Sequence, residues 1–228
     1  MDPVDWIIVD DAHAAQMAER ARLLAVQRDA VLAMDPSARP AAEELLQAVV
    51  DVLATRQDYA VDKDHVRRPD GVTVALDHQD PVATLGHLVQ QDLCLMEKRG
   101  DEHVLTAAVL CFPASWTLDE KFMRPLTGIH VPVESYDDAM ASRVQRLFDG
   151  VQVGRPIWRF NALWYADPVL HQPRREANRR EERAASEARY LRTERQSILR
   201  LPRTGAVVFG IHTSVLDQTT VRALWPQA

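Results

Sequence analysis

Residues 93–112 read LCLMEKRGDEHVLTAAVLCF, and this stretch decides the fold class. Two apolar runs, 93–97 and 103–112, flank a charged turn that contains Gly100. Apolar runs of this length around a glycine turn are typical of adjacent antiparallel strands. Pro113 ends the second run, because proline has no backbone N–H to give to a strand ladder. The stretch therefore predicts an antiparallel hairpin.

A third strand is predicted over residues 156–164, PIWRFNALW. Its side chains alternate between two faces, as they do in any extended strand. One face carries Trp158, Phe160 and Trp164, whereas the other carries Arg159 and Asn161. We expect a strand with an aromatic face and a face that bears polar groups.

Three shorter runs are also predicted to be strands. Residues 72–76 alternate after an Asp-Gly turn. The runs 197–201 and 206–212 flank Pro-Arg-Thr-Gly, which is a good turn tetrad, and so predict a second hairpin.

Helical periodicity is confined to other segments. Apolar residues recur at helical spacing over 12–33, 40–55 and 137–149. A short helix follows Asp80-Pro81, where the aspartate caps the first turn and the proline loses no needed donor. Residues 124–136 contain two prolines and a glycine, so we expect an ordered loop there instead of a regular helix.

The order of these segments is helices, strands, short helices and strands. That order predicts an α+β fold with an antiparallel sheet. We divide the chain into an N-terminal helical segment, 1–60, and a sheet domain, 61–228.

Composition narrows the class of protein. Of the 228 residues, 46% are hydrophobic and 26% charged, which excludes a wholly disordered chain. The formal net charge of -6 argues against a nucleic-acid partner. The first residues do not resemble a signal peptide, and no apolar run approaches the 18 residues of a membrane span. We expect a cytoplasmic protein without a membrane partner.

Common catalytic signatures are missing from the sequence, which has no GxGxxG, phosphate loop, HExxH, CxxC or GxSxG. Cys94 and Cys111 lie in apolar runs, and we interpret them as buried thiols instead of a disulfide.

His130 is the leading candidate for a metal ligand. It lies in the constrained segment TGIHVP between apolar neighbours, where a fixed imidazole could bind haem iron. The alternative is a packed histidine that bonds a carbonyl group. His212 ends an apolar strand and could point into a cavity or into solvent. Cys111 is a weaker candidate as a thiolate ligand.

The segment from Arg174 to Arg195 holds eight arginines and five glutamates. Its first half is typical of a solvated helix. Its end, LRTERQ, leads towards the strand at 197, so we expect polar side chains at a cavity mouth. Arg192 and Arg195 could clamp carboxylates, and Glu194 could hold a cationic amine.

A resemblance to a known family rests on five ordered stretches of this chain. The sequence is similar to the alpha subunits of haem-dependent oxidative N-demethylases over about residues 5–10 and 70–215. The stretches are CFPASWTLDEKF, RPLTGIHVPVESY, RVQRLFDG, RPIWRFNALWYADPVL and YLRTERQSILRLPRTGAVVFGIHT. The chain departs from the family pattern at His171 and His212.

The resemblance implies a PAS-type domain, in which helices cover an antiparallel sheet and haem b occupies the cavity between them. It implies oxidative N-demethylation of a small secondary amine such as dimethylamine with O2. NADPH, FMN and a 2Fe-2S cluster would reside on electron-transfer partner subunits. His130 would bind the iron, Arg192 and Arg195 would contact the haem propionates, and Glu194 and Arg195 would act on amine and dioxygen.

Two other functions share the same expected cavity. A haem-binding PAS-type sensor or interaction module would bind the cofactor without turnover. A structural subunit would carry an empty cavity. The sequence leaves the substrate, the oligomeric state and the electron donors open.

Overall fold

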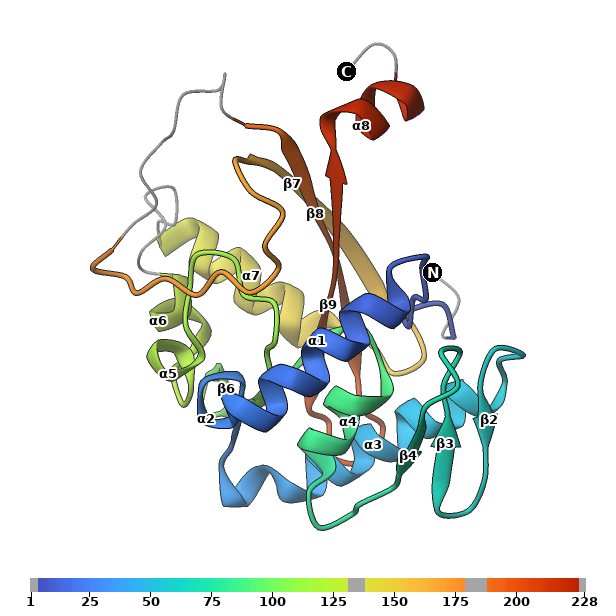
Figure 1. Ribbon diagram of the computed structural model, residues 1–228. Helices are drawn as coiled ribbons and strands as arrows, with labels where there is room; N and C mark the ends of the chain where they lie inside the picture. The colour runs from blue at the N-terminus through green and yellow to red at the C-terminus, as the bar shows by residue number, and fades with distance from the viewer. Residues whose placement is uncertain (1–3, 131–137, 179–187, 226–228) are drawn as a thin grey trace.

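A six-stranded antiparallel sheet forms the centre of the computed structural model, which describes residues 4–130, 138–178 and 188–225, without the side chains of His130 and of 138–141. The strand order is β1-β6-β5-β9-β8-β7 (Figure 1). The strands are β1 (Leu32–Met34), β5 (Asp92–Arg99), β6 (Glu102–Val109), β7 (Ile157–Tyr165), β8 (Tyr190–Arg200) and β9 (Val207–Asp217). All neighbouring strands pair antiparallel. The α+β class predicted from the sequence is confirmed, and the architecture is consistent with a PAS-like fold.

Helices cover both faces of this sheet. The first face packs against α1 (His13–Val26), α3 (Arg39–Ala54) and α4 (Pro81–Leu88). The second packs against α5 (Leu118–Lys121), α6 (Leu126–His130) and α7 (Asp138–Gly150). Leu93 and Leu95 of β5 belong to the first core, whereas Cys94 and Met96 belong to the second. The N-terminal helices therefore form one covering layer, and α5, α6 and α7 form the other.

Smaller elements surround these layers. A three-stranded sheet of β2 (Ala60–Val61), β3 (His65–Arg67) and β4 (Thr73–Ala75) lies beside α3 and α4. The short helices are α2 (Arg28–Val31), η1 (Pro36–Ala38) and α8 (Gln218–Leu224). Figure 1 shows α8 at the far end of β9, away from the N-terminal helices.

Several local predictions are confirmed. The Asp80 side chain accepts a hydrogen bond from the Ala83 amide, so it caps α4 as expected, with Pro81 in the first turn. Gly100 adopts a positive φ of 64° in the turn between β5 and β6, a conformation that favours glycine. Helix α3 and strand β7 lie within one residue of their predicted positions, and the strands of the hairpin lie within three.

Three local predictions were wrong. The helix predicted over 12–33 stops earlier, because Leu32–Met34 forms β1 and gains backbone partners on β6. The loop predicted over 124–136 contains α6, since Pro125 precedes the helix and removes no helical hydrogen bond; residues 131–137 lie outside the described part. Strand β8 begins at Tyr190, so LRTERQ lies within a strand and not at its entrance.

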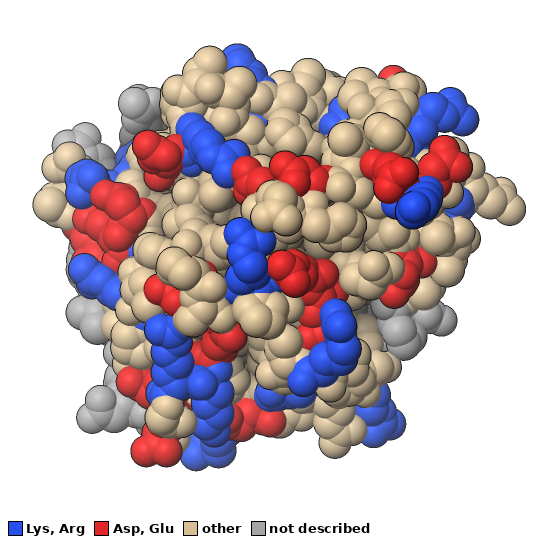
Figure 2. Space-filling view, turned by 90° about the horizontal axis from the view of Figure 1, so that it is seen from below, with Lys and Arg blue, Asp and Glu red and all other residues tan. Residues whose placement is uncertain are grey.

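The predicted N-terminal segment, 1–60, shares its core with the sheet. It supplies β1, and its helices contribute Leu24 and Leu46 to the same apolar cluster as Leu93 and Val208. The face of the molecule seen in Figure 2 carries basic and acidic side chains side by side, with no broad patch of one sign.

Candidate functional site

A cavity of about 440 Å³ lies between the second face of the sheet and helices α5, α6 and α7. This volume is within the usual range of about 300–1,000 Å³ for cofactor and ligand sites. Most of its lining is apolar. The sheet contributes Cys94, Met96, Leu105, Ile198, Phe209 and Ile211, and the helices contribute Leu126, Ile129, Val144, Leu147 and Phe148.

A row of polar side chains occupies one side of the cavity, on β7 and β8. The Arg159 Nε donates to the Oε1 of Gln196, and the Gln196 amide donates to the Glu194 Oε2 at 3.1 Å. Glu194 and Gln196 share a face because they are two residues apart on a strand. Arg159 is exposed, so this row runs from solvent into the cavity.

A second polar group closes the side opposite the sheet. Lys121 is only 4% exposed, and its ammonium donates to the Ile129 carbonyl and to Glu176. Lys121 is therefore a buried residue and not a member of a surface ion pair with Glu120. The lysine instead fixes the end of α6 against α5 and against the segment that contains Glu176.

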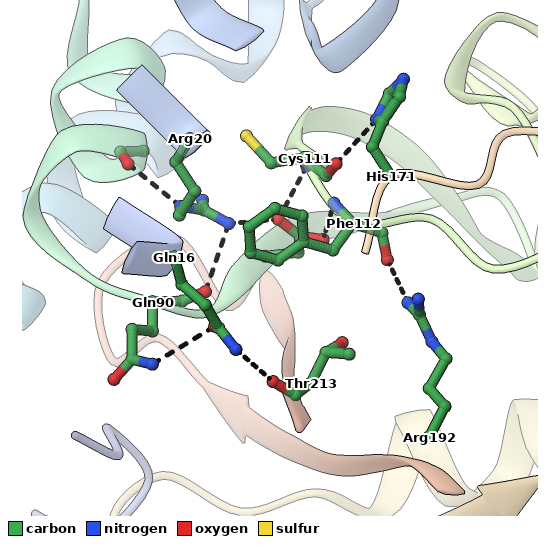
Figure 3. A network of polar contacts seen from close by, with 10 residues as sticks. Gln16, Arg20, Gln90, Cys111, Phe112, His171, Arg192 and Thr213 are labelled. Atoms are coloured by element: carbon green, nitrogen blue, oxygen red, sulfur yellow. Dashed lines mark hydrogen bonds and ion pairs between the residues drawn. The ribbon is translucent and has the colours of Figure 1, made fainter. Parts of the chain in front are cut away.

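Arg192 contacts Glu194, a member of the polar row on β7 and β8, but it does not itself line the cavity. Its guanidinium donates to the Phe112 carbonyl at 2.7 Å (Figure 3). It also donates to the Leu170 carbonyl at 2.9 Å, and its Nε reaches Glu194 at 3.4 Å. These bonds occupy the guanidinium, so the geometry favours a positioning role for Arg192, through Glu194, over propionate binding.

A buried ion pair also fixes the backbone at Phe112 and at the preceding residue. Arg20 of α1 and Asp92 of β5 are almost fully buried and 2.5 Å apart. Asp92 also accepts the amide hydrogens of Cys111 and Phe112. Together with the bond from Arg192 to the Phe112 carbonyl, these bonds hold the backbone of Cys111 and Phe112 (Figure 3). The backbone of residues 111–112, beside the cavity, is therefore fixed by hydrogen bonds to both Asp92 and Arg192.

The structure places Arg195 on the opposite face of β8 from Glu194. Its guanidinium carbon lies 5.3 Å from the centroid of the Trp158 ring, on the first face of the sheet. Neighbouring residues of a strand point to opposite faces, so one cavity cannot receive both side chains. His212 lies on that first face as well, with its Nε2 2.9 Å from Asp10, so it points neither into the cavity nor into solvent.

A comparison with protein families matches residues 1–225 to one described as haem-dependent oxidative N-demethylase, alpha subunit-like. The chain belongs to this family. Its description names a haem-dependent enzyme and likens the family to the alpha subunit of that enzyme.

The cavity fits the haem that the family description names. Haem is a flat apolar macrocycle with two carboxylates on one edge. The apolar lining suits the macrocycle, and the exposed Arg159 and Arg175 at the open side suit the carboxylates. Arg175 already pairs with Asp119, which leaves Arg159 as the better carboxylate partner.

His130 is the last residue of α6, directly after Ile129, which lines the cavity. Its side chain lies outside the described residues, so its role as iron ligand stays a prediction. Among the described side chains, no group of three His, Cys, Asp or Glu could hold a bare metal ion. A haem brings its own macrocycle ligands and needs only an axial one from the protein.

Neither cysteine is activated as a thiolate by the protein around it. Cys94 lines the cavity, but burial raises the pKa of its thiol well above the usual range. Burial also raises the pKa of Cys111 to about 12, and this residue belongs to the network beside the cavity. Both thiols therefore stay protonated at neutral pH.

Sequence reasoning missed Arg20, Arg159 and Gln196. Arg20 interrupts the apolar face of α1 between Met17 and Leu24, and an arginine at such a position indicates a buried partner. Within the described residues, no helix has both the length and the apolar character needed to cross a bilayer.

Proposed function

We propose that this chain binds haem b in the cavity and oxidises the N-methyl group of a small, dimethylamine-like secondary amine. The observation that carries the proposal is an apolar cavity with an ordered polar row, Arg159, Gln196 and Glu194, on one side. The family description supports the haem-dependent N-demethylase class. Electrons would come from NADPH through partner subunits that carry FMN and a 2Fe-2S cluster.

The balanced reaction sets what the protein must supply. Dimethylamine, O2, two electrons and two protons give methylamine, formaldehyde and water. The haem supplies the dioxygen and one-electron chemistry when bound. The chain's residues bind and orient the amine, and they exclude water.

Glu194 would hold the amine. Its carboxylate lines the cavity and is oriented by Gln196 and Arg192. A carboxylate accepts strong hydrogen bonds from an ammonium or amine N–H. Because its two partners fix its position, Glu194 would direct the methyl group into the apolar part of the cavity.

His130 and Arg159 would hold the cofactor. His130 would bind the iron, because it follows Ile129, which lines the cavity, at the end of α6. Arg159 would bind a propionate at the open side, in place of the Arg195 predicted from the sequence.

The test is formaldehyde formation by haem-loaded protein. The assay uses dimethylamine in air-saturated buffer, with NADPH and a surrogate ferredoxin and ferredoxin reductase as the electron source. The absorbance spectrum verifies that the haem is reduced. Formaldehyde that depends on haem and amine supports the proposal.

Two outcomes would overturn it. Haem that binds and is reduced without formaldehyde indicates the sensor or interaction module. Purified protein that takes up no haem indicates a structural subunit.

A further inference from the structure

Strand β7 combines a sheet edge with an exposed apolar surface. Among the described residues, it pairs only with β8, along all nine of its residues. Its first eight residues are exposed, and only Tyr165 is buried. Trp158 is 54% and Phe160 58% exposed on the first face of the sheet, and Leu163 is 50% exposed on the cavity face.

Such an edge is unusual for a strand that faces only solvent. Natural edge strands are usually short, charged or interrupted by proline, since an unpaired apolar edge recruits another strand. Within β7, Arg159 is the one charged residue, and it lies on the cavity face. The aromatic face carries no charge of its own.

The side chains of β7 are self-complementary about its central residue, Asn161. If a second copy of the strand pairs antiparallel about a two-fold axis at Asn161, Trp158 faces Trp164 of the second copy. In the same register, Phe160 faces Ala162 of the second copy, so a large side chain meets a small one. Cross-strand aromatic pairs of this kind stabilise antiparallel ladders.

We propose that two copies of this chain associate along β7, antiparallel and in the register that pairs Asn161 with itself. Each copy contributes the same surface, as two-fold association requires. The two six-stranded sheets then form one continuous sheet. The side chains of β7 match their own reversed copy in size, so the second copy is the occupant that the sequence of the strand favours.

The register has a consequence for the cavity. Arg159, which lines the cavity, would face Leu163 of the second copy across the new ladder. Each copy would therefore place an apolar side chain beside the cavity of the other. The association itself does not depend on haem or amine.

The first test is the mass of the purified chain by analytical ultracentrifugation. Association predicts twice the 25.8 kDa of one chain, whereas Phe160→Glu should shift the mass to one chain. The glutamate would face Arg195 on β8, so the fold should tolerate it. A wild-type chain that stays monomeric at tens of micromolar would overturn the proposal.

The second test reads the register. Asn161→Cys places two thiols opposite each other at the axis, within the Cα separation that a disulfide requires, and should cross-link under mild oxidation. Ala162→Cys is the matched control, because its counterpart would be Phe160 and it should cross-link much less. The native cysteines are both buried. Equal cross-linking of the two variants would refute this register, and capture of a different protein by β7 would refute the choice of occupant.

Discussion

Glu194 is the residue whose replacement should change the chemistry without changing the fold. Glu194→Gln keeps the size of the side chain but removes the charge that would hold the amine. A hydrogen bond to a charged group contributes about 1.5–3 kcal/mol, so we expect a loss of about 10- to 100-fold in kcat/KM for dimethylamine. Formaldehyde assays measure this loss, with Glu43→Gln on the exposed side of α3 as the control.

The spectrum should remain unchanged in Glu194→Gln, because the residue is not proposed to touch the iron. An unaltered kcat/KM in this variant would remove Glu194 from the site.

Replacement of His130 tests the second residue prediction, that this histidine binds the haem iron. His130→Ala should shift or abolish the Soret band, and added imidazole should restore it by occupying the same position on the iron. The exposed His65 of β3 provides the matched control, His65→Ala. A wild-type spectrum in His130→Ala would contradict the ligand assignment.

Single residues also show how far the sequence can be interpreted. The placement of Glu194 on the cavity face follows from alternation once β8 is known to begin at Tyr190. Glu194 and Arg195 are expected at one cavity mouth only if LRTERQ precedes the strand, whereas within β8 they point to opposite faces. The pairing of Lys121 with Glu176 could not be predicted, since 55 residues separate them and nothing local links them.

The buried pair of Arg20 and Asp92 connects elements that are distant in the sequence. Arg20 also donates to the Gly86 and Gln90 carbonyls, so it joins α1, the helix α4 and β5. Asp92→Asn leaves a buried guanidinium without its counter-charge, which costs about 3–5 kcal/mol.

Urea unfolding measures this cost. Arg22→Ala removes an exposed pair with Glu19 on the same helix, and we expect a change below about 1 kcal/mol there. Equal losses in the two variants would show that the buried pair has no special role.

A second link, between Asp10 and β9, should make stability depend on pH. Burial would raise the pKa of Asp10, but hydrogen bonds from His212 and Gln90 outweigh it and lower the pKa from 3.8 to about 2. A lowered folded-state pKa stabilises the fold above the unfolded value and loses that effect as the pH falls towards the folded value.

Asp10→Asn should therefore lower the free energy of unfolding at pH 6 by up to about 2 kcal/mol, and by less near pH 2 to 3. Chemical unfolding at the two pH values measures both differences. A loss that is the same at both would contradict the assigned pKa.

At the element scale, the sequence was informative where a pattern is local. The hairpin, the capped α4 and the aromatic face of β7 were predicted because each depends on spacing within about ten residues. Strand β1 was missed, since Leu32–Met34 continues a helical pattern and becomes a strand only through its pairing with β6. Helix α6 is not predicted, because proline breaks a helix interior but is tolerated directly before the first turn.

At the scale of the whole molecule, the fold class followed from the order of elements, but the layers did not. The N-terminal helices cover one face of the sheet and leave α5, α6 and α7 to enclose the other. The cavity of about 440 Å³ depends on the distance between these three helices and the sheet. No periodicity in the sequence encodes that distance.

The central claim is that haem occupies the cavity on the second face of the sheet. Haemin titration, followed by the Soret band, tests it with two variants of the same strand. Ile198→Trp fills the cavity from its floor, whereas Thr193→Trp adds the same bulk on the opposite face of β8. Circular dichroism verifies that both variants are folded. We expect wild type and Thr193→Trp to bind one haem per chain and Ile198→Trp to bind none; a folded Ile198→Trp that binds haem as tightly as wild type would contradict the account.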